Sequence, residues 1–533
     1  MPQFSSPSSR TLHVSPARSS TPSDVSDKAT AALVRRVLCP HAHAGSVEPR
    51  PINVLLPPLT SSNDIDLQLY ATIAVVVKDL VHSWYGKITP DQGFVEEVVR
   101  IVAHCTTQLE SRLRSVDLEG LVFDELPELV EGHVSAYRIS HQTKHPPPLS
   151  TNSRVIYHNL NPHPAFSPVP NPANPSAAKE QQEHEAQYRQ LLVQGALAVL
   201  LPTEDLENAC LRTLVADVIA DSIMGNSIGG MVCEGWFIWA SITKFIDVVK
   251  ARIEPEATGE ELEVGTRSRL EKFGLLSEKN QSTDRNLSNH SRKSTFSSMF
   301  WRILQYFYLA FMTARFVILG FVTAYSQPPR SSTLKAPGSP IATKVEPLRK
   351  PRPIISFRVF PLISDLLDLP SRMPWVSGSL ALLQHHLIYG PLGVGTTDGI
   401  LDQYIHHLIL THLHPPTLLP QILQRIRQVL FTNSTLPPPS HPPPETEEVT
   451  AIKRHCAESI LSLLPPAVCG KFFASEDREL CVEEVENELD VWGDGYMNKH
   501  LAYAAVELIL VRVLPELGDK SVEELLRKRI GDV

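Results

Sequence analysis

Cysteine is scarce and scattered in this sequence of 533 residues. Its seven cysteines lie far apart, their number is odd, and no C-x-x-C pair occurs. This pattern excludes a disulfide-stapled secreted scaffold and is typical of a reducing cytosolic compartment. The amino-terminal residues also lack the apolar run of a signal peptide, so we expect a protein that faces the cytosol.

The sequence has no excess of positive charge. Lysine and arginine number 49 against 58 acidic residues, which gives a formal net charge of -9. A general nucleic-acid binder carries a strong basic balance, so that class of protein is excluded. Alternation of apolar and polar residues, which marks half-buried strands, is also rare, while apolar residues at spacings of three and four recur. We therefore predict an all-α fold class.

Proline is abundant, with 45 residues against 25 glycines, and it divides the chain into blocks. We predict a mostly disordered tail at 1–51 with a short helix at 26–38, and two helical domains at 52–253 and 354–533 that pack together. The Pro-rich stretch 145–176 is expected to be a non-helical loop inside the first domain, and 436–445 a loop inside the second. Between the domains we expect a polar linker at 254–297, an apolar helix at 298–326 and a Pro/basic linker at 327–353.

The apolar segment 298–326 is long enough to cross a hydrocarbon core as a helix. Arg302 lies near one end, whereas Arg315 lies deeper, where a charge is costly in lipid. A narrow stripe carries its polar and small residues: Ser298, Arg302, Gln305, Thr313, Gly320 and Thr323. The segment is also dense in aromatic residues, and those expected to contact a membrane are Phe300, Trp301, Phe307, Phe311, Phe316 and Phe321.

Three structures are compatible with this segment: a helix in the membrane interface, a single span, and a buried core helix. Both flanks are basic, so the positive-inside rule gives no orientation and favours two cytosolic ends. The polar linkers on both sides disfavour the core helix.

No motif carries a credible catalytic or metal site. Residues 225–229 match G-x-S-x-G around Ser227, but a nucleophile elbow follows a strand, and the preceding residues read as a helix, so we expect a helix break. The histidines His406, His407, His412 and His414 lack the i, i+4 spacing of helical metal ligands. The glycine-rich 390–395 lacks the pattern of a phosphate loop. We therefore expect neither an enzyme, nor a metal, nor a cofactor.

One set of residues resembles the PX-associated (PXA) domain of the sorting nexin family over about 52–250. The matching residues are Leu56-Pro57-Pro58-Leu59-Thr60, Asp64, Asp66, Tyr70, Trp84-Tyr85, Ile88, Asp91, Phe94, Asp124-Glu125 and His163-Pro164-Ala165. The Trp84-Tyr85 pair is the most distinctive part, and we expect it to be structural.

The carboxyl-terminal block resembles the nexin C-terminal domain. Asn498-Lys499-His500 opens an apolar helix as in the last helix of that domain, and its start is similar around 360–375. Members of the family commonly have a PX domain between these two parts. Residues 254–353 are too short and too dissimilar for one, and they hold the apolar segment instead.

These resemblances imply a function in endosomal or vacuolar trafficking or at organelle contacts. They imply that the two helical domains enclose an apolar cavity that binds or transfers phospholipid, with a phosphoinositide among the candidate lipids. The implied partners are an organelle membrane, phospholipid and trafficking proteins, on the cytosolic face of an endosomal, vacuolar or endoplasmic reticulum membrane. The alternative is a scaffold that binds trafficking proteins through its helical surfaces and carries no lipid.

Overall fold

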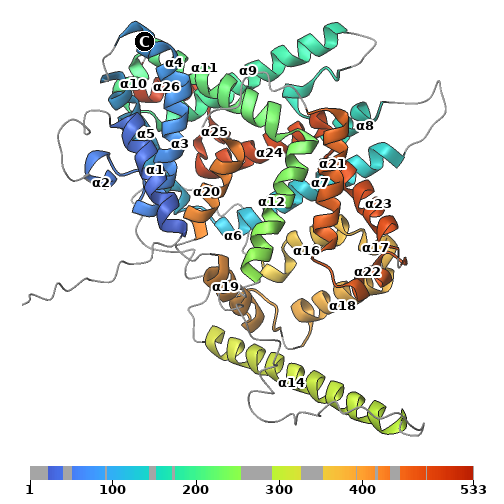
Figure 1. Ribbon diagram of the computed structural model, residues 1–533. Helices are drawn as coiled ribbons and strands as arrows, with labels where there is room; N and C mark the ends of the chain where they lie inside the picture. Colours follow the sequence, from blue (N-terminus) through green and yellow to red (C-terminus); the bar gives the residue numbers. More distant parts are fainter. Residues whose placement is uncertain are drawn as a thin grey trace, which may run out of the picture. The chain divides into compact units, whose positions relative to one another are not determined.

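The fold is all-α, as predicted (Figure 1). The computed structural model describes residues 22–39, 51–89, 93–142, 152–170, 175–253, 291–325, 352–391, 393–413, 418–431, 444–475 and 477–531. None of these residues lies in a β-strand. The predicted tail up to residue 21, most of both linkers and most of the loop at 436–445 lie outside the described residues.

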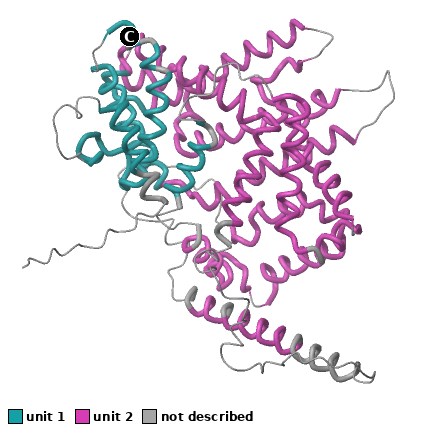
Figure 2. Tube along the Cα trace, viewed as in Figure 1, with its two compact units in different colours: residues 1–114, 200–205, 416–438 teal, residues 115–199, 206–415, 439–533 magenta. Residues whose placement is uncertain are grey.

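The chain divides into two compact units, and unit 1 comprises residues 1–114, 200–205 and 416–438 (Figure 2). Its helices are α1 (Pro22–Leu38), α2 (Ile52–Leu55), α3 (Asn63–Val76), the π-helical turn η2 (Val77–Val81), α4 (His82–Ile88), α5 (Gly93–Leu113) and α20 (Leu418–Leu430). Helices α1 and α20 both pack against α3. The predicted tail helix is thus present, begins at Pro22, and buries Val34 and Val37 in the core of this unit.

Asp66 explains several of the residues that resemble the PXA pattern. Its buried carboxylate accepts hydrogen bonds from the Leu59 amide at 3.1 Å, and from the Thr60 amide at 2.7 Å and hydroxyl at 2.6 Å. The hydroxyl of Tyr70, one turn later on α3, donates to the Pro57 carbonyl. The loop before α3 is therefore fixed by polar side chains of the helix that follows it.

Unit 2 comprises residues 115–199, 206–415 and 439–533. Its amino-terminal helices are α6 (Leu118–Gly120), η3 (Leu121–Glu125), α7 (Leu126–Gln142), α8 (Ser153–Leu160), η4 (Pro164–Phe166), α9 (Pro175–Leu200), α11 (Ala209–Asp217), η5 (Val218–Val232) and α12 (Gly235–Ile253). The last residue of α9 and the first three residues of α10 (Thr203–Glu207) belong to unit 1. The later helices are α14 (Ser291–Tyr325), η6 (Ile354–Ser356), α16 (Val359–Leu366), α17 (Leu369–Arg372), α18 (Pro374–Tyr389), α19 (Ile400–Leu413), α21 (Thr446–Leu461), α22 (Pro466–Phe472), α23 (Arg478–Leu489), η8 (Asp490–Trp492), α24 (Gly495–Val513), α25 (Glu516–Asp519) and α26 (Val522–Ile530).

Helices from the two predicted sequence domains pack against one another inside unit 2. Helix α12 packs on α21, α7 packs on α16, and α24 packs on both α7 and α8. One core cluster joins Trp239 of α12 to Cys456 of α21 and Val482 of α23. The Trp239 indole also donates to the Leu489 carbonyl at 3.1 Å. Apolar burial therefore crosses from one sequence block to the other.

The prediction of a non-helical loop at 145–176 is wrong for part of this stretch. Helix α8 begins after Asn152, whose side chain accepts from the Arg154 amide at 3.0 Å and caps it. Tyr157 and Phe166 are fully buried. The prolines lie on both sides of residues 149–161 and not within them. This proline-free gap is long enough for two helical turns. A count of prolines over the whole stretch does not reveal the gap.

Candidate functional site

Helix α14 is an apolar helix that unit 2 leaves almost uncovered. Its segment Ile303–Val322 has 20 residues with a mean hydropathy of 1.5, and none of this window is buried. A helix of 20 residues is about 30 Å long, close to the thickness of a hydrocarbon core. Among the described residues, no other helix has the length and apolar composition of a membrane span. A core helix would be buried, so that alternative does not fit.

The aromatic residues predicted to contact a membrane are placed as follows. Phe307 is 71% exposed and Phe311 is 57% exposed. Phe321 is half-buried, with its ring 5.3 Å from that of Tyr404 in α19. Phe300, Trp301 and Phe316 lie on α14, but their side chains are outside the described part of the chain.

Gly320 is where α14 meets the rest of unit 2. A Cβ at this position would lie 2.1 Å from the Tyr404 ring, so only glycine permits the contact. Gly320 belongs to the polar and small stripe predicted from the sequence. The contact indicates that the stripe faces the protein at this end of the helix, while Phe307 and Phe311 point away from it.

An open apolar hollow of about 340 Å³ lies along α12. It is lined by Val232, Phe237, Ile238, Ser241, Ile242 and Phe245. Phe245 at its edge is 69% exposed. The Ser241 hydroxyl is the one polar side chain in this lining, so the hollow suits an apolar group.

A second cavity, of about 330 Å³, lies between α7, α8 and α24. Its apolar lining residues are Leu129, Leu160, Pro162, Leu501 and Ala504, and its polar ones include Glu128, Asn161, His133, His163 and His500. The Nδ1 of His163 accepts from the Ala165 amide at 3.2 Å, so its Nε2 carries the proton. This buried N–H lies 3.9 Å from the Glu507 carboxylate, too far for a hydrogen bond. This N–H is therefore buried without a hydrogen-bond partner among the described residues.

The other histidines beside this cavity have defined tautomers. His500 Nδ1 donates to the Tyr496 carbonyl at 3.0 Å, so its Nε2 accepts from His158 Nδ1 at 3.1 Å. His133 donates to the Val491 carbonyl at 3.4 Å and accepts from the Tyr157 hydroxyl at 2.7 Å. Burial lowers the pKa of His500 to about 3 and that of His133 to about 4. Both imidazoles are neutral at pH 7.

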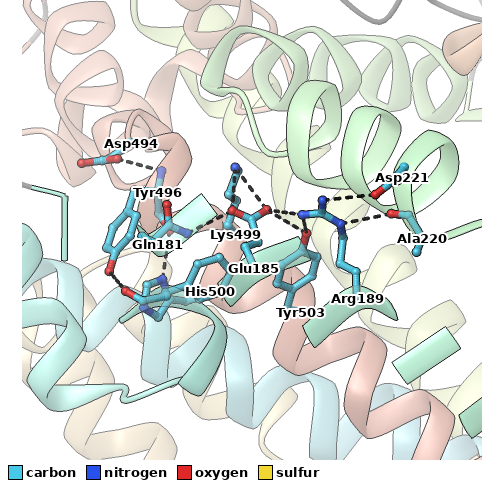
Figure 3. Close-up of polar contacts among 11 residues, drawn as sticks. Gln181, Glu185, Arg189, Ala220, Asp221, Asp494, Tyr496, Lys499, His500 and Tyr503 are labelled. Atoms are coloured by element: carbon cyan, nitrogen blue, oxygen red, sulfur yellow. Dashed lines mark hydrogen bonds and ion pairs between the residues drawn. The ribbon is translucent and has the colours of Figure 1, made fainter. Parts of the chain in front are cut away.

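A buried network of charges joins α9 to α24 and η5 (Figure 3). The Glu185 carboxylate accepts from Arg189 and from the Tyr503 hydroxyl, each at 3.0 Å, and lies 3.4 Å from the Lys499 ammonium. Gln181 donates to its other oxygen at 3.0 Å. Burial and the adjacent Glu185 carboxylate raise the pKa of Tyr503. Every polar atom of Glu185 is satisfied, so the network holds three helices together and leaves no group free for chemistry.

The predicted family-motif residues are divided between unit 2 and unit 1. Lys499 belongs to the buried network, and His500 stacks on Phe166 with ring centroids 4.3 Å apart. Asn498 donates to the carbonyls of Cys233 at 2.8 Å and Trp492 at 2.7 Å. In unit 1, the Tyr85 ring lies 4.9 Å from Phe94, whereas the side chain of Trp84 is not among those described.

The G-x-S-x-G match lies in η5, a continuous π-helix, so the predicted helix break is wrong. The wide turns let buried side chains approach closely: a Cβ on Gly225 would lie 3.2 Å from the Arg189 guanidinium, and one on Gly229 would lie 2.9 Å from the Tyr503 hydroxyl. The Ser227 hydroxyl donates to the Ser222 carbonyl at 3.2 Å. The preceding α11 is a helix and not a strand, so a nucleophile elbow is absent here.

The histidine-rich helix is α19. His406 pairs with Glu119 of α6, and His407 is half-buried. The side chain of His412, and His414 altogether, lie outside the described residues. Where the structure is described, no group of three His, Cys, Asp or Glu side chains could hold a metal ion.

Sequence reasoning missed Glu185, Arg189 and Tyr503. A signal was present on α9, where buried positions recur every fourth residue, as in Ala177, Gln181, Glu185, Val193 and Leu197. Polar residues within such an apolar stripe indicate a buried network, because they need partners. The partners themselves lie on α24, more than 300 residues later, and no spacing rule reaches that far.

Comparison with known proteins places the first domain. A family model for the PXA domain matches residues 62–245. PXA domain protein 1 of Schizosaccharomyces pombe (strain 972) is 29% identical over 156 residues, which are 28% of this chain and 29% of that protein. The chain therefore covers under a third of that relative's length. No solved structure matches the chain significantly. The predicted PXA resemblance is confirmed, while the nexin-C resemblance at 354–533 stays a prediction.

Proposed function

We propose that this chain, which carries a PXA domain at residues 62–245, is a membrane-associated protein of intracellular trafficking that binds or transfers phospholipid. Its place is the cytosolic face of an endosomal, vacuolar or endoplasmic reticulum membrane. The observation that carries the proposal is the exposed apolar segment Ile303–Val322. Exposure of such a surface to water costs roughly 25 cal/mol per Å² of apolar area, and a bilayer removes this cost because it covers the surface.

Lipid binding is supported by the two cavities of unit 2. The hollow along α12 suits an acyl segment, because its lining is apolar. The cavity between α7, α8 and α24 combines apolar walls with polar side chains such as Asn161 and Glu128. An acyl segment with its adjacent ester group suits such a mixed lining.

A second candidate function is a scaffold that binds trafficking proteins and no lipid. The observation in its favour is cavity size, since about 330 Å³ and 340 Å³ lie at the low end of the roughly 300–1,000 Å³ of ligand sites. Neither cavity holds both acyl chains of a phospholipid without widening.

Two experiments separate these functions. Full-length protein, purified from membranes and washed in detergent, is expected to retain phospholipid detectable by mass spectrometry. Ala504→Phe narrows the cavity beside His163 and is expected to lower this lipid several-fold, whereas Leu214→Phe on an exposed surface leaves it unchanged. An empty wild-type protein would favour the scaffold.

Membrane association is tested on α14. Phe307→Glu combined with Phe311→Glu places two charges on its exposed face and is expected to move the protein from the membrane to the soluble fraction of cell lysates. Retention of this variant on membranes would contradict the role of α14.

A further inference from the structure

Helix α18 is rich in apolar side chains and has no buried residue. Its 16 residues contain no Asp, Glu, Lys or Arg. Its largest exposed side chains are Trp375 at 73%, Tyr389 at 76%, Leu382 at 60%, Leu383 at 55% and Leu380 at 52%. A surface helix normally pairs one apolar face with a charged one, and α18 has no Asp, Glu, Lys or Arg to form such a face.

Two polar side chains of α18 are hydrogen-bonded within the protein, whereas His385 and His386 are exposed. The Ser379 hydroxyl donates to the Trp375 carbonyl of the preceding turn at 2.7 Å. The Gln384 amide donates to the Ile355 carbonyl of η6 at 2.7 Å. The helix can therefore lie at the boundary of an apolar phase, provided that His385 and His386 stay in contact with water or headgroups.

Length and end residues indicate the interface of a bilayer. Sixteen residues make a helix of about 24 Å, short of the roughly 30 Å of a hydrocarbon core. Trp375 lies in its first turn and Tyr389 is its last residue. Tryptophan and tyrosine are the residues that concentrate at the boundary of acyl chains and headgroups. A short apolar helix with these ends is typical of an interfacial segment.

The neighbourhood of α18 fits the same surface. A short turn joins α18 to α19, in which the Gly395 amide donates to the Leu387 carbonyl at 2.8 Å, and α19 packs on α14. The sequence from 327 to 353, between α14 and α18, has six basic residues and one acidic one. Such a segment is attracted to anionic headgroups.

We infer that α18 is a second membrane contact of this chain, which places Trp375, Leu382 and Leu383 at the acyl–headgroup boundary of an anionic bilayer. The inference rests on the proposed membrane association, since it assigns α18 to the same bilayer as α14. It adds a contact surface that the apolar segment 298–326 does not include.

The test is fluorescence quenching in the full chain, reconstituted into vesicles of phosphatidylcholine and phosphatidylserine with brominated acyl chains. Bromine quenches only tryptophans at the bilayer. Trp375→Phe is expected to remove roughly half of the quenched signal, because Trp301 of α14 supplies the other half. Trp236→Phe is the matched control, since that residue packs against the core of α12 and α21 and its loss should leave the quenched signal unchanged.

The same series separates the two proposals. If Trp301→Phe reduces the quenched signal and Trp375→Phe does not, the inference on α18 is overturned while the role of α14 stands. If neither substitution changes it, both are overturned. If only Trp375→Phe reduces it, α18 is the contact and the role of α14 is lost.

A flotation assay adds a quantitative measure. In the otherwise unchanged chain, Leu383→Glu is expected to lower vesicle binding by at least about tenfold, the loss that about 1.4 kcal/mol produces. Leu191→Glu, at a leucine 59% exposed on α9, should not change it. If Leu383→Glu instead converts a detergent-solubilised dimer into a monomer, a second copy of the chain covers α18 and the inference is wrong.

Discussion

Glu185 is the residue on which the polar core of unit 2 depends. It is 3% exposed and lies against two cations, Arg189 and Lys499. A buried pair that loses one partner leaves an uncompensated charge, which costs about 3–5 kcal/mol. We therefore expect Glu185→Gln to destabilise the protein by that order, as measured by urea unfolding of the detergent-solubilised chain.

The matched control is Glu183→Gln on the same helix. Its carboxylate is 61% exposed and lies 3.9 Å from Lys179, so we expect a change within about 0.5 kcal/mol. An equal effect of both substitutions would show that the buried network does not stabilise the fold.

The buried histidines make stability depend on pH. Burial lowers the pKa of His500 to about 3 and of His133 to about 4, while an unfolded histidine titrates near 6.5. Below about pH 6.5 these histidines bind protons in the unfolded chain but stay neutral in the folded chain. Stability is therefore full above that pH and falls as pH drops towards 4, by about 1.4 kcal/mol per pH unit for each histidine.

We expect His500→Gln to reduce this slope by about one proton between pH 6 and pH 4, measured as unfolding free energy against pH. The rings that face His500 are those of Phe166, His158, His163, Tyr157 and Tyr496. Burial raises the pKa of Glu131 and Glu234, which offsets part of the slope equally in both proteins. His455→Gln, on the surface, serves as control, and an unchanged slope in His500→Gln would refute the assignment.

At the scale of the element, close contacts with buried side chains explain the glycines of η5. A Cβ on Gly229 would meet the Tyr503 hydroxyl at 2.9 Å and the Glu185 carboxylate at 3.3 Å, and both belong to a satisfied network. We expect Gly229→Ala to cost about 1–3 kcal/mol of unfolding free energy through overpacking. The next residue offers the control: Gly230 is exposed, its nearest contact would be at 3.5 Å, and Gly230→Ala should be tolerated. Equal loss in both variants would point to the π-helical backbone instead.

The elements differ in how far the sequence predicted them. Helices with one apolar face, such as α1 and α5, were predictable because their periodicity is local. The π-helical η5 was not predictable, because the sequence does not distinguish a glycine that allows a close contact from a glycine that ends a helix. Helix α8 was concealed by the prolines around it. The network of Glu185 joins residues too distant along the chain for any local pattern.

The whole molecule combines segments that the sequence separates. Helix α20 joins unit 1, where its Arg427 donates to the Thr30 hydroxyl at 3.1 Å and to Gln68 at 3.4 Å. The sequence predicted it as part of a separate carboxyl-terminal domain. Its own periodicity marks an apolar face, and only the fold shows that α3 covers it.

Because helices from the two sequence blocks pack together, the fold predicts how fragments of the chain behave. Residues 354–533 expressed alone would expose the faces of α21 and α24 that pack on α12, α7 and α8, and would lack the partners of α20. We expect fragments 1–253 and 354–533 each to aggregate when expressed singly, and to co-purify as a stoichiometric complex when expressed together. Since their contacts do not involve 254–353, the complex should form without that segment. Glu185→Gln in the first fragment should weaken it, whereas Glu183→Gln should not. A soluble, monomeric 354–533 with cooperative thermal unfolding would show instead that the carboxyl-terminal block is an independent domain.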